Sequence, residues 1–199
     1  MEDYGDTEIL RINVVGTSGS GKSTFCQRLS KILSIPHIEM DAVFWGPNWH
    51  WPSDEEFFAK LKKELNQDAW ILDGNYTRTI PLKWERVQLV IWLDYSFRRT
   101  LFQAIKRALV RSLSKQELWA GTGNRESLKR MFSKDSIILW TIKTHKKVRV
   151  KYERLMTDEA YSHIEFVRLR SPEEAEDFLS DVSCCRLHGK VVAEVTRIQ

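Results

Sequence analysis

Hydrophobic residues along the chain form two patterns, short continuous runs and longer stretches in which they recur every three or four positions. The runs are rich in β-branched and aromatic residues and predict buried strands at Ile9–Val15, Pro36–Asp41, Trp70–Asp73, Val87–Asp94 and Ile164–Leu169. The longer stretches predict helices at Lys22–Ser34, Ser53–Leu65, Ser96–Leu113, about Lys134–Leu155, and from Ser171 onward. Ser53 and Ser171 are each followed three residues later by Glu, which is typical of a helix N-terminus.

Strands that alternate with helices predict an α/β fold, a P-loop three-layer sandwich in which a five-stranded parallel sheet has helices on both faces. We expect a single domain over residues 1–179, with a polar, glycine-containing lid excursion at about 112–133. The remaining residues, 180–199, form a C-terminal tail with a possible short strand at Val191–Val195. Ligands of such sheets bind at the carboxyl ends of the strands, where Gly16, Asp41, Asp73 and Asp94 are expected.

Composition narrows the class of protein. The chain has 199 residues, 42% hydrophobic and 29% charged, which is ordinary for a soluble globular protein, and its net charge of +4 is too small to indicate nucleic acid by itself. No apolar run approaches the roughly 18 residues of a membrane span, and the N-terminus lacks the layout of a signal peptide. We therefore expect a cytoplasmic protein without a membrane partner. The three cysteines form neither a disulfide framework nor a zinc pattern, and Cys26 is expected to be a small buried residue.

The segment "GTSGSGKST" follows the first predicted strand and opens the first predicted helix. It fits the phosphate-loop pattern G-x-x-x-x-G-K-[ST] in every fixed position. Its glycines allow successive N–H groups to point at an anion, Lys22 supplies charge for the outer phosphates, and Ser23 offers a hydroxyl to Mg²⁺. The residues expected to bind ATP here are Gly16, Thr17, Ser18, Gly19, Ser20, Gly21, Lys22, Ser23 and Thr24.

A magnesium ion held by Ser23 also needs an acidic residue on a neighbouring strand. Asp73 and Asp94 both end apolar runs. Asp73 is favoured because the following Gly74 would let the backbone approach phosphate, whereas Asp94 could simply support the next helix.

Basic residues on the Ser96–Leu113 helix suggest how the transferred phosphoryl group is neutralised. Arg107 and Arg111 belong to a stripe at i, i+4 spacing, and Arg125 lies in the excursion that follows. Arginines on a closing lid stabilise the charge of a transferring phosphoryl group, although such a stripe can also be an ordinary solvated face.

The loop Ala42–Pro52 follows the second predicted strand and contains three tryptophans. Trp45 and its neighbours could stack on a base or sugar, or form a small core beneath the loop. Asp41, at the carboxyl end of that strand, is expected to face the ligand. His37 is expected to be structural.

The order of several motifs resembles the bacterial adenylate-kinase-like proteins known as DNA topology modulation proteins. The resemblance covers residues 9–179 and rests on "GTSGSGKST", "HIEMDAVFW", "WILDGNY", "VIWLD", "GNRES" and "FVRLRSPEEAEDFL". It implies a nucleoside-monophosphate-kinase fold, ATP and Mg²⁺ as cofactors, and adenine held near Arg170 and Pro172. It also implies an acceptor held by Asp41, Gly74, Asn75, Tyr76 and Arg78. True adenylate kinases carry D-G-F-P-R where this chain has D-G-N-Y-T-R, which puts AMP as the acceptor in doubt.

The sequence predicts a phosphotransferase but leaves its acceptor open. A phosphate acceptor needs no general base, whereas an alcohol needs one, and Asp41 is the best-placed candidate. The alternative function is a nucleotide-dependent DNA-binding protein that uses the basic stretch Lys143–Lys151. The sequence does not indicate an oligomeric state.

Overall fold

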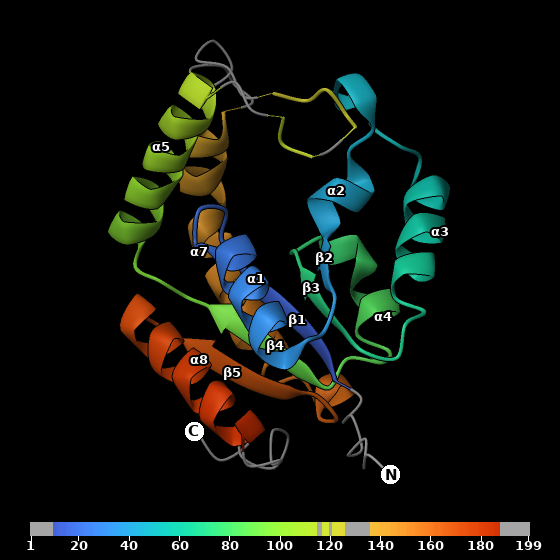
Figure 1. Cartoon of the computed structure of the whole chain (residues 1–199), viewed down its shortest axis with the longest axis vertical. Helices are drawn as coiled ribbons and strands as arrows, with labels where there is room; N and C mark the ends of the chain where they lie inside the picture. The colour runs from blue at the N-terminus through green and yellow to red at the C-terminus, as the bar shows by residue number, and fades with distance from the viewer. Residues whose placement is uncertain (1–9, 115–116, 120, 126–135, 188–199) are drawn as a thin grey trace.

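A parallel sheet forms the centre of the molecule (Figure 1). The computed structural model describes residues 10–114, 117–119, 121–125 and 136–187. Its strands are β1 (Arg11–Gly16), β2 (His37–Glu39), β3 (Trp70–Asp73), β4 (Leu89–Leu93) and β5 (Glu165–Leu169). They pair in parallel in the order β2-β3-β1-β4-β5, which confirms the predicted sheet. Because β1 is central, the loop that follows it is flanked by the ends of β3 and β4.

Helices cover both faces of this sheet. They are α1 (Lys22–Leu33), α2 (Met40–Phe44), α3 (Asp54–Glu64), α4 (Ile80–Lys83), α5 (Phe97–Ser114), α7 (Ile137–Leu155) and α8 (Pro172–Leu187). Three short 3₁₀ turns, η1 (Pro47–Trp49), η2 (Thr77–Thr79) and η3 (Glu159–Tyr161), lie between them. One face packs against α1 and α8 around Phe25 and Phe178, and the other packs around Phe57, Trp92 and Tyr152. The predicted three-layer fold is therefore confirmed.

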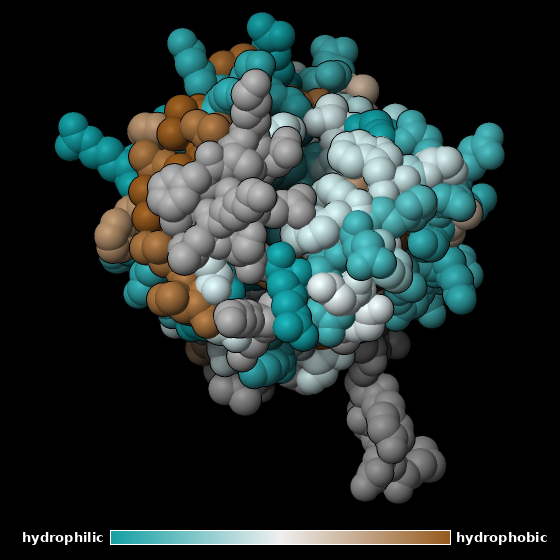
Figure 2. Space-filling model, turned by 90° about the horizontal axis from the view of Figure 1, so that it is seen from above, coloured by the Kyte–Doolittle hydropathy of each residue, from teal (hydrophilic) through white to brown (hydrophobic). Residues whose placement is uncertain are grey.

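Helix α5 differs from its prediction in the face that it buries. The spacing of apolar residues predicts an inner side made of Phe97, Leu101, Ile105, Ala108 and Leu109; Ala108 is indeed buried, but Phe97, Ile105 and Leu109 are among the exposed large side chains. The residues that α5 buries are small ones: Thr100, Ala104, Ala108 and Ser112. The exposed apolar side chains form the brown surface at the left of Figure 2, on the side where α5 lies in Figure 1. Small side chains are needed on this face because α5 packs closely against the loop between β1 and α1.

Two predicted segments lie wholly or partly outside the described residues. They are the possible strand Val191–Val195 and, within the lid excursion, residues 115, 116, 120 and 126–133. The predicted boundary between domain and tail at residue 179 falls within α8, and that division stays a prediction. Among the described residues, none of the helices is long and apolar enough to cross a bilayer.

Candidate active site

The loop between β1 and α1 has the backbone of a phosphate cradle. Gly16, Gly19 and Gly21 have φ values of 146°, 87° and 90°, a region that side chains other than glycine rarely adopt. A Cβ on Gly19 would lie 2.8 Å from the Cβ of Ala104 and 2.9 Å from the carbonyl oxygen of Thr100. The loop therefore packs directly on α5, and only small α5 side chains leave room for it. Helix α1 begins at once after Gly21, so its positive end is directed at the loop.

Lys22 folds back over this loop. Its Nζ donates hydrogen bonds to the carbonyl oxygens of Gly16 at 3.0 Å and Thr17 at 3.2 Å. Desolvation lowers the pKa of Lys22, while the nearby Asp73 carboxylate opposes that shift. The ammonium is thus held at the mouth of the cradle by neutral carbonyl groups, which an incoming phosphate can replace with a stronger, charge-assisted contact.

Ser23 and Asp73 come together at the base of the loop, as a magnesium site would require. The Ser23 Oγ donates a hydrogen bond of 2.5 Å to Asp73 Oδ2, and Asp73 is buried. A hydroxyl and a carboxylate are hard oxygen donors, and two such donors beside a phosphate cradle fit Mg²⁺.

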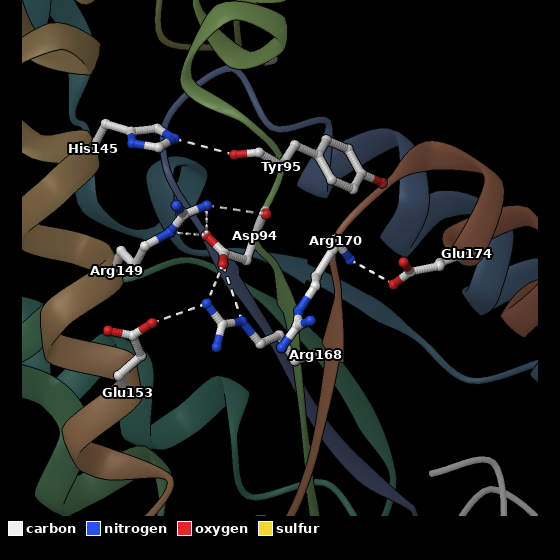
Figure 3. A network of polar contacts seen from close by, with 8 residues as sticks. All are labelled: Asp94, Tyr95, His145, Arg149, Glu153, Arg168, Arg170 and Glu174. Atoms are coloured by element: carbon white, nitrogen blue, oxygen red, sulfur yellow. Dashed lines mark hydrogen bonds and ion pairs between the residues drawn. The ribbon is translucent and has the colours of Figure 1, made fainter.

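Asp94, the other acidic candidate, is occupied elsewhere (Figure 3). Its side chain is only 5% exposed and forms ion pairs with Arg149 at 2.9 Å and with Arg168 at 2.6 Å. Arg168 also lies over the ring of Trp92, 4.3 Å from its centroid, and bonds Glu153. Asp94 therefore ties α7 to strands β4 and β5, a structural role that follows from two arginines the sequence did not single out.

Asn75 braces the phosphate loop, although the sequence analysis had placed it with the acceptor. The backbone N–H of Gly16 donates to Asn75 Oδ1 at 3.0 Å, and Asn75 Nδ2 donates to the Gly16 carbonyl at 2.5 Å. The hydroxyl of Tyr152, from α7, donates to the same Oδ1 at 3.3 Å. The segment after β3 and the segment after β1 are thus joined by one side-chain amide.

Gly74 and its surroundings form a tight and well-bonded platform under this segment. A Cβ on Gly74, whose φ is 152°, would lie 2.7 Å from the Cβ of Met40. The Gly74 carbonyl accepts hydrogen bonds from the buried Lys83 Nζ at 3.1 Å and from Asn13 Nδ2 at 3.3 Å. Burial lowers the pKa of Lys83, so its side chain loses a proton more readily than that of an exposed lysine. The neutral amine can still donate the hydrogen bond to the Gly74 carbonyl.

Asp41 and Tyr76 form a pair on the acceptor side. The Tyr76 hydroxyl donates to Asp41 Oδ1 at 2.8 Å. Asp41 keeps an exposed surface, yet desolvation by the surrounding protein atoms raises the pKa of its carboxyl, and the Tyr76 hydrogen bond partly offsets this. Asp73 raises the pKa of Asp41 further, whereas the positive charges of Lys22 and Arg107 lower it, so these groups of the phosphate-loop region are close enough to act on Asp41 electrostatically.

Arg78, by contrast, is already engaged. It forms an ion pair with Asp54 at 2.6 Å, and its guanidinium lies 5.3 Å from the ring centroids of both Phe44 and Phe57. This position fixes α3 against the segment after β3. No sequence pattern indicates this ion pair, because an acidic residue at Asp54 is already explained by its place as the first residue of α3.

The three candidate lid arginines are placed differently. Arg107 Nη2 donates to Ser18 Oγ at 3.3 Å, which brings its charge to the phosphate loop. Arg111 lies one turn further along α5 and is half-buried, and Arg125 is exposed, with its backbone bridged to Glu117. Thr141 of α7, which the sequence analysis did not single out, donates to the Ser18 carbonyl at 3.2 Å.

The tryptophans of the loop after β2 pack with one another and with the excursion. Trp45 lies 5.4 Å from Trp49, 5.7 Å from Trp51 and 6.5 Å from Trp119, measured between ring centroids. Asn124, which is 1% exposed, accepts from the Trp49 N–H at 2.7 Å and donates to the Gly46 carbonyl at 3.0 Å. The described part of the excursion is thus docked on the tryptophan loop, on the acceptor side.

The other residues predicted to bind ATP lie in the phosphate loop, on α1 and at the start of α8. Thr17 and Ser20 are buried in the loop, Thr24 is exposed on α1, and Arg170 and Pro172 lie between β5 and the first turn of α8. The Arg170 N–H donates to Glu174 Oε2 at 2.7 Å (Figure 3).

Comparisons with known proteins agree with this architecture. A family described as an AAA domain matches residues 12–102, which span the loop, Asp73 and the start of α5. The solved structure of shikimate kinase from Acinetobacter baumannii in complex with shikimate is similar to this chain, with a TM-score of 0.54 and 14% sequence identity. The match covers 93% of this chain and 97% of that one, so the similarity concerns the entire fold. The chain therefore has a P-loop, nucleotide-kinase-like fold.

Proposed function

We propose that the protein is an ATP-dependent kinase that phosphorylates a hydroxyl group of a small molecule. One observation carries this proposal. Asp41 comes just after β2, at the carboxyl edge of the sheet where the phosphate loop also begins, and its carboxylate accepts a hydrogen bond from Tyr76 at 2.8 Å. A carboxylate at this position would repel an acceptor phosphate but would accept the proton of an attacking alcohol.

The state of Arg78 supports an alcohol over a phosphate acceptor. Its guanidinium is paired with Asp54 and packed between two aromatic rings, so binding a phosphate there would require that arrangement to break. The similar solved protein is named shikimate kinase and was solved in complex with shikimate, which is consistent with a small-molecule acceptor.

The chain's own residues suggest each part of the transfer. The phosphate loop and Lys22 hold the β- and γ-phosphates, and Ser23 and Asp73 hold Mg²⁺, which supplies charge neutralisation when bound. Asp41 takes the proton of the acceptor hydroxyl as its oxygen forms the new bond to the γ-phosphorus. The bond to the ADP oxygen breaks, and Lys22 and Arg107 stabilise the charge that shifts to ADP. Arg111 and Arg125 are further candidates to contact the transferring phosphoryl group, and Trp45 and Tyr76 would line the acceptor.

The test is a panel of acceptors. Mg²⁺-dependent ATP consumption is measured with nucleoside monophosphates, nucleosides, and sugar and acid alcohols, with Lys22→Ala as the control. A single alcohol that raises turnover well above background supports the proposal. Turnover with a monophosphate that survives Asp41→Asn contradicts it.

A second function has a specific observation in its favour. Lys143, Lys146, Lys147, Lys151 and Arg154 line a groove of about 770 Å³ along α7. The positive charge of these side chains suits a polyanion, which favours a nucleotide-dependent DNA-binding protein as the second candidate, although Asp158 also lines the groove. DNA binding whose affinity falls steeply with salt, and which depends on these lysines, would support it; salt-independent or absent binding would count against it.

A further inference from the structure

Three side chains that could bind a soft metal ion meet directly behind the phosphate loop. They are Cys26 from α1, His37 from β2 and Asp73 from β3. One ligand atom from each (a thiol sulfur, a ring nitrogen and a carboxylate oxygen) lies within 4.8 Å of the other two. They come from three separate elements, and no spacing in the sequence connects them.

The local geometry explains why they converge. Cys26 lies three residues after Ser23 on α1, so both side chains are on the helix face that meets Asp73. His37 pairs with Ile71, two residues before Asp73, so its side chain lies on the same face of the sheet as that of Asp73. The side chains of Cys26 on α1 and of His37 on β2 therefore both lie in the layer between the sheet and α1.

The polar atoms of this cluster are incompletely satisfied. The Nε2 of His37 is buried and has no hydrogen-bond partner, which costs free energy unless another group occupies the position. Asp73 uses Oδ2 for the Ser23 hydroxyl, and Cys26 is fully buried with a free thiol. His37 is the one member of the three that is half-buried, whereas Cys26 and Asp73 are buried.

We propose that Cys26, His37 and Asp73 form a binding site for a divalent transition-metal ion of the zinc class. Sulfur, imidazole and carboxylate ligands suit Zn²⁺ and do not suit Mg²⁺. Zinc binds these atoms at about 2.0–2.3 Å, so tetrahedral ligands are about 3.3–3.8 Å apart, and the present spacing needs to close by no more than about 1.5 Å. The fourth position would be left to water.

Occupation of this site has a consequence for the phosphate loop, and this part rests on the proposed function. Asp73 is also the carboxylate proposed to hold Mg²⁺ with Ser23. A zinc ion bound to Asp73 would neutralise the carboxylate charge that Mg²⁺ also needs, and it would place a second cation close to the magnesium position. Zinc should therefore weaken Mg²⁺–ATP binding and inhibit turnover.

The first experiment measures the metal directly and does not depend on activity. The purified full chain is titrated with Co²⁺ as a spectroscopic substitute for zinc, followed by competition with Zn²⁺. The expected result is a thiolate-to-cobalt charge-transfer band with tetrahedral d–d bands, all removed by Zn²⁺. The band should be lost in Cys26→Ala, and His37→Gln should bind at least about tenfold more weakly.

Matched controls make the result decisive. The double variant Cys184→Ala/Cys185→Ala should keep the full signal, because both residues lie in the last turns of α8, far along the chain from the three proposed ligands. Circular dichroism checks that each variant is folded, and Cys26→Val, which fills the buried site with an apolar side chain of similar size, gives a second test if Cys26→Ala unfolds. The absence of a thiolate band in the wild type, or a band that follows Cys184 and Cys185, would overturn the site.

The second experiment tests the competition. ATP turnover is measured at a fixed, subsaturating Mg²⁺ concentration while free Zn²⁺ is raised with a metal buffer. Wild type should be inhibited, excess Mg²⁺ should relieve the inhibition, and Cys26→Ala should be resistant. Inhibition that is equal in wild type and Cys26→Ala would overturn the competition. A chain without kinase activity would refute the proposed function while the cobalt titration still decides the metal site.

Discussion

Tyr76→Phe tests whether Asp41 is the general base of the transfer. The change removes only the hydroxyl that donates to Asp41 Oδ1 at 2.8 Å, while the ring can keep its contacts with Phe44 and Phe57 at centroid distances of 5.1 and 5.2 Å. That hydrogen bond stabilises the carboxylate, so its loss should raise further a pKa that desolvation already raises.

The size of the effect follows from the geometry. A hydrogen bond to a charged group contributes about 1.5–3 kcal/mol in a buried site, and we take about 1 kcal/mol because Asp41 keeps an exposed surface. One pKa unit corresponds to about 1.4 kcal/mol, so the pKa of Asp41 should rise by about 0.7 units. A base must be ionised to act, and the acid limb of activity therefore moves to higher pH by that amount.

The assay is the pH dependence of kcat/KM for the acceptor identified in the panel. Tyr95→Phe, at a tyrosine in the core on the α1 and α8 side of the sheet, is the matched control and should leave the limb in place. Asp41→Asn should remove the activity that depends on the limb. An acid limb that stays fixed in Tyr76→Phe, or moves to lower pH, would refute the assignment of Asp41 as the base.

Three further predictions follow from the site. Lys22→Ala should lower kcat by at least about a hundredfold, because a phosphate loop without its ammonium loses the charge that stabilises the transferring group; single-turnover kinetics measure it, and full activity would contradict the phosphate-loop assignment. Gly74→Ala should destabilise the fold by about 2–4 kcal/mol, because its Cβ would meet Met40 at 2.7 Å from a strained φ, and urea unfolding should show a lower midpoint at constant m-value. Asp94→Asn should destabilise the fold by about 1–3 kcal/mol, since it removes the buried carboxylate shared by Arg149 and Arg168, whose side chains are 38% and 22% exposed and can be partly solvated; thermal unfolding that matches wild type would refute the structural role given to Asp94.

The sheet could be predicted from the sequence because its signals are local. Buried parallel strands are continuous apolar runs, and each of the five runs contains its strand to within a few residues. The phosphate loop was equally legible, since its chemistry lies in consecutive residues. Pairing of Ser23 with Asp73 followed from the rule that strand ends share one edge, and the structure brings these two side chains into hydrogen-bond contact.

Features that depend on contacts between distant segments could not be predicted in this way. The inner face of α5 was misassigned because periodicity shows where large apolar residues lie, whereas the fold needed small residues opposite Gly19. Acceptor binding by Asn75 and Arg78 stays a prediction, but the contacts that the structure gives them were not foreseen. Nothing in the sequence shows that the Asn75 amide reaches Gly16, and Asp54, the partner of Arg78, lies in a helix with an independent reason to begin with an acidic residue.

The amide of Asn75 has a consequence for how the protein would respond to its two substrates. This amide forms hydrogen bonds with both the N–H and the carbonyl of Gly16, while the hydroxyl of the adjacent Tyr76 donates a hydrogen bond to Asp41. A shift of the phosphate loop on nucleotide binding would therefore be passed through Asn75 and the adjacent Tyr76 to the carboxylate of Asp41. Thermodynamic linkage then requires reciprocity: whatever factor ATP applies to acceptor affinity, the acceptor must apply to ATP affinity. The segment after β3 would in that case couple the binding of ATP to the binding of the acceptor.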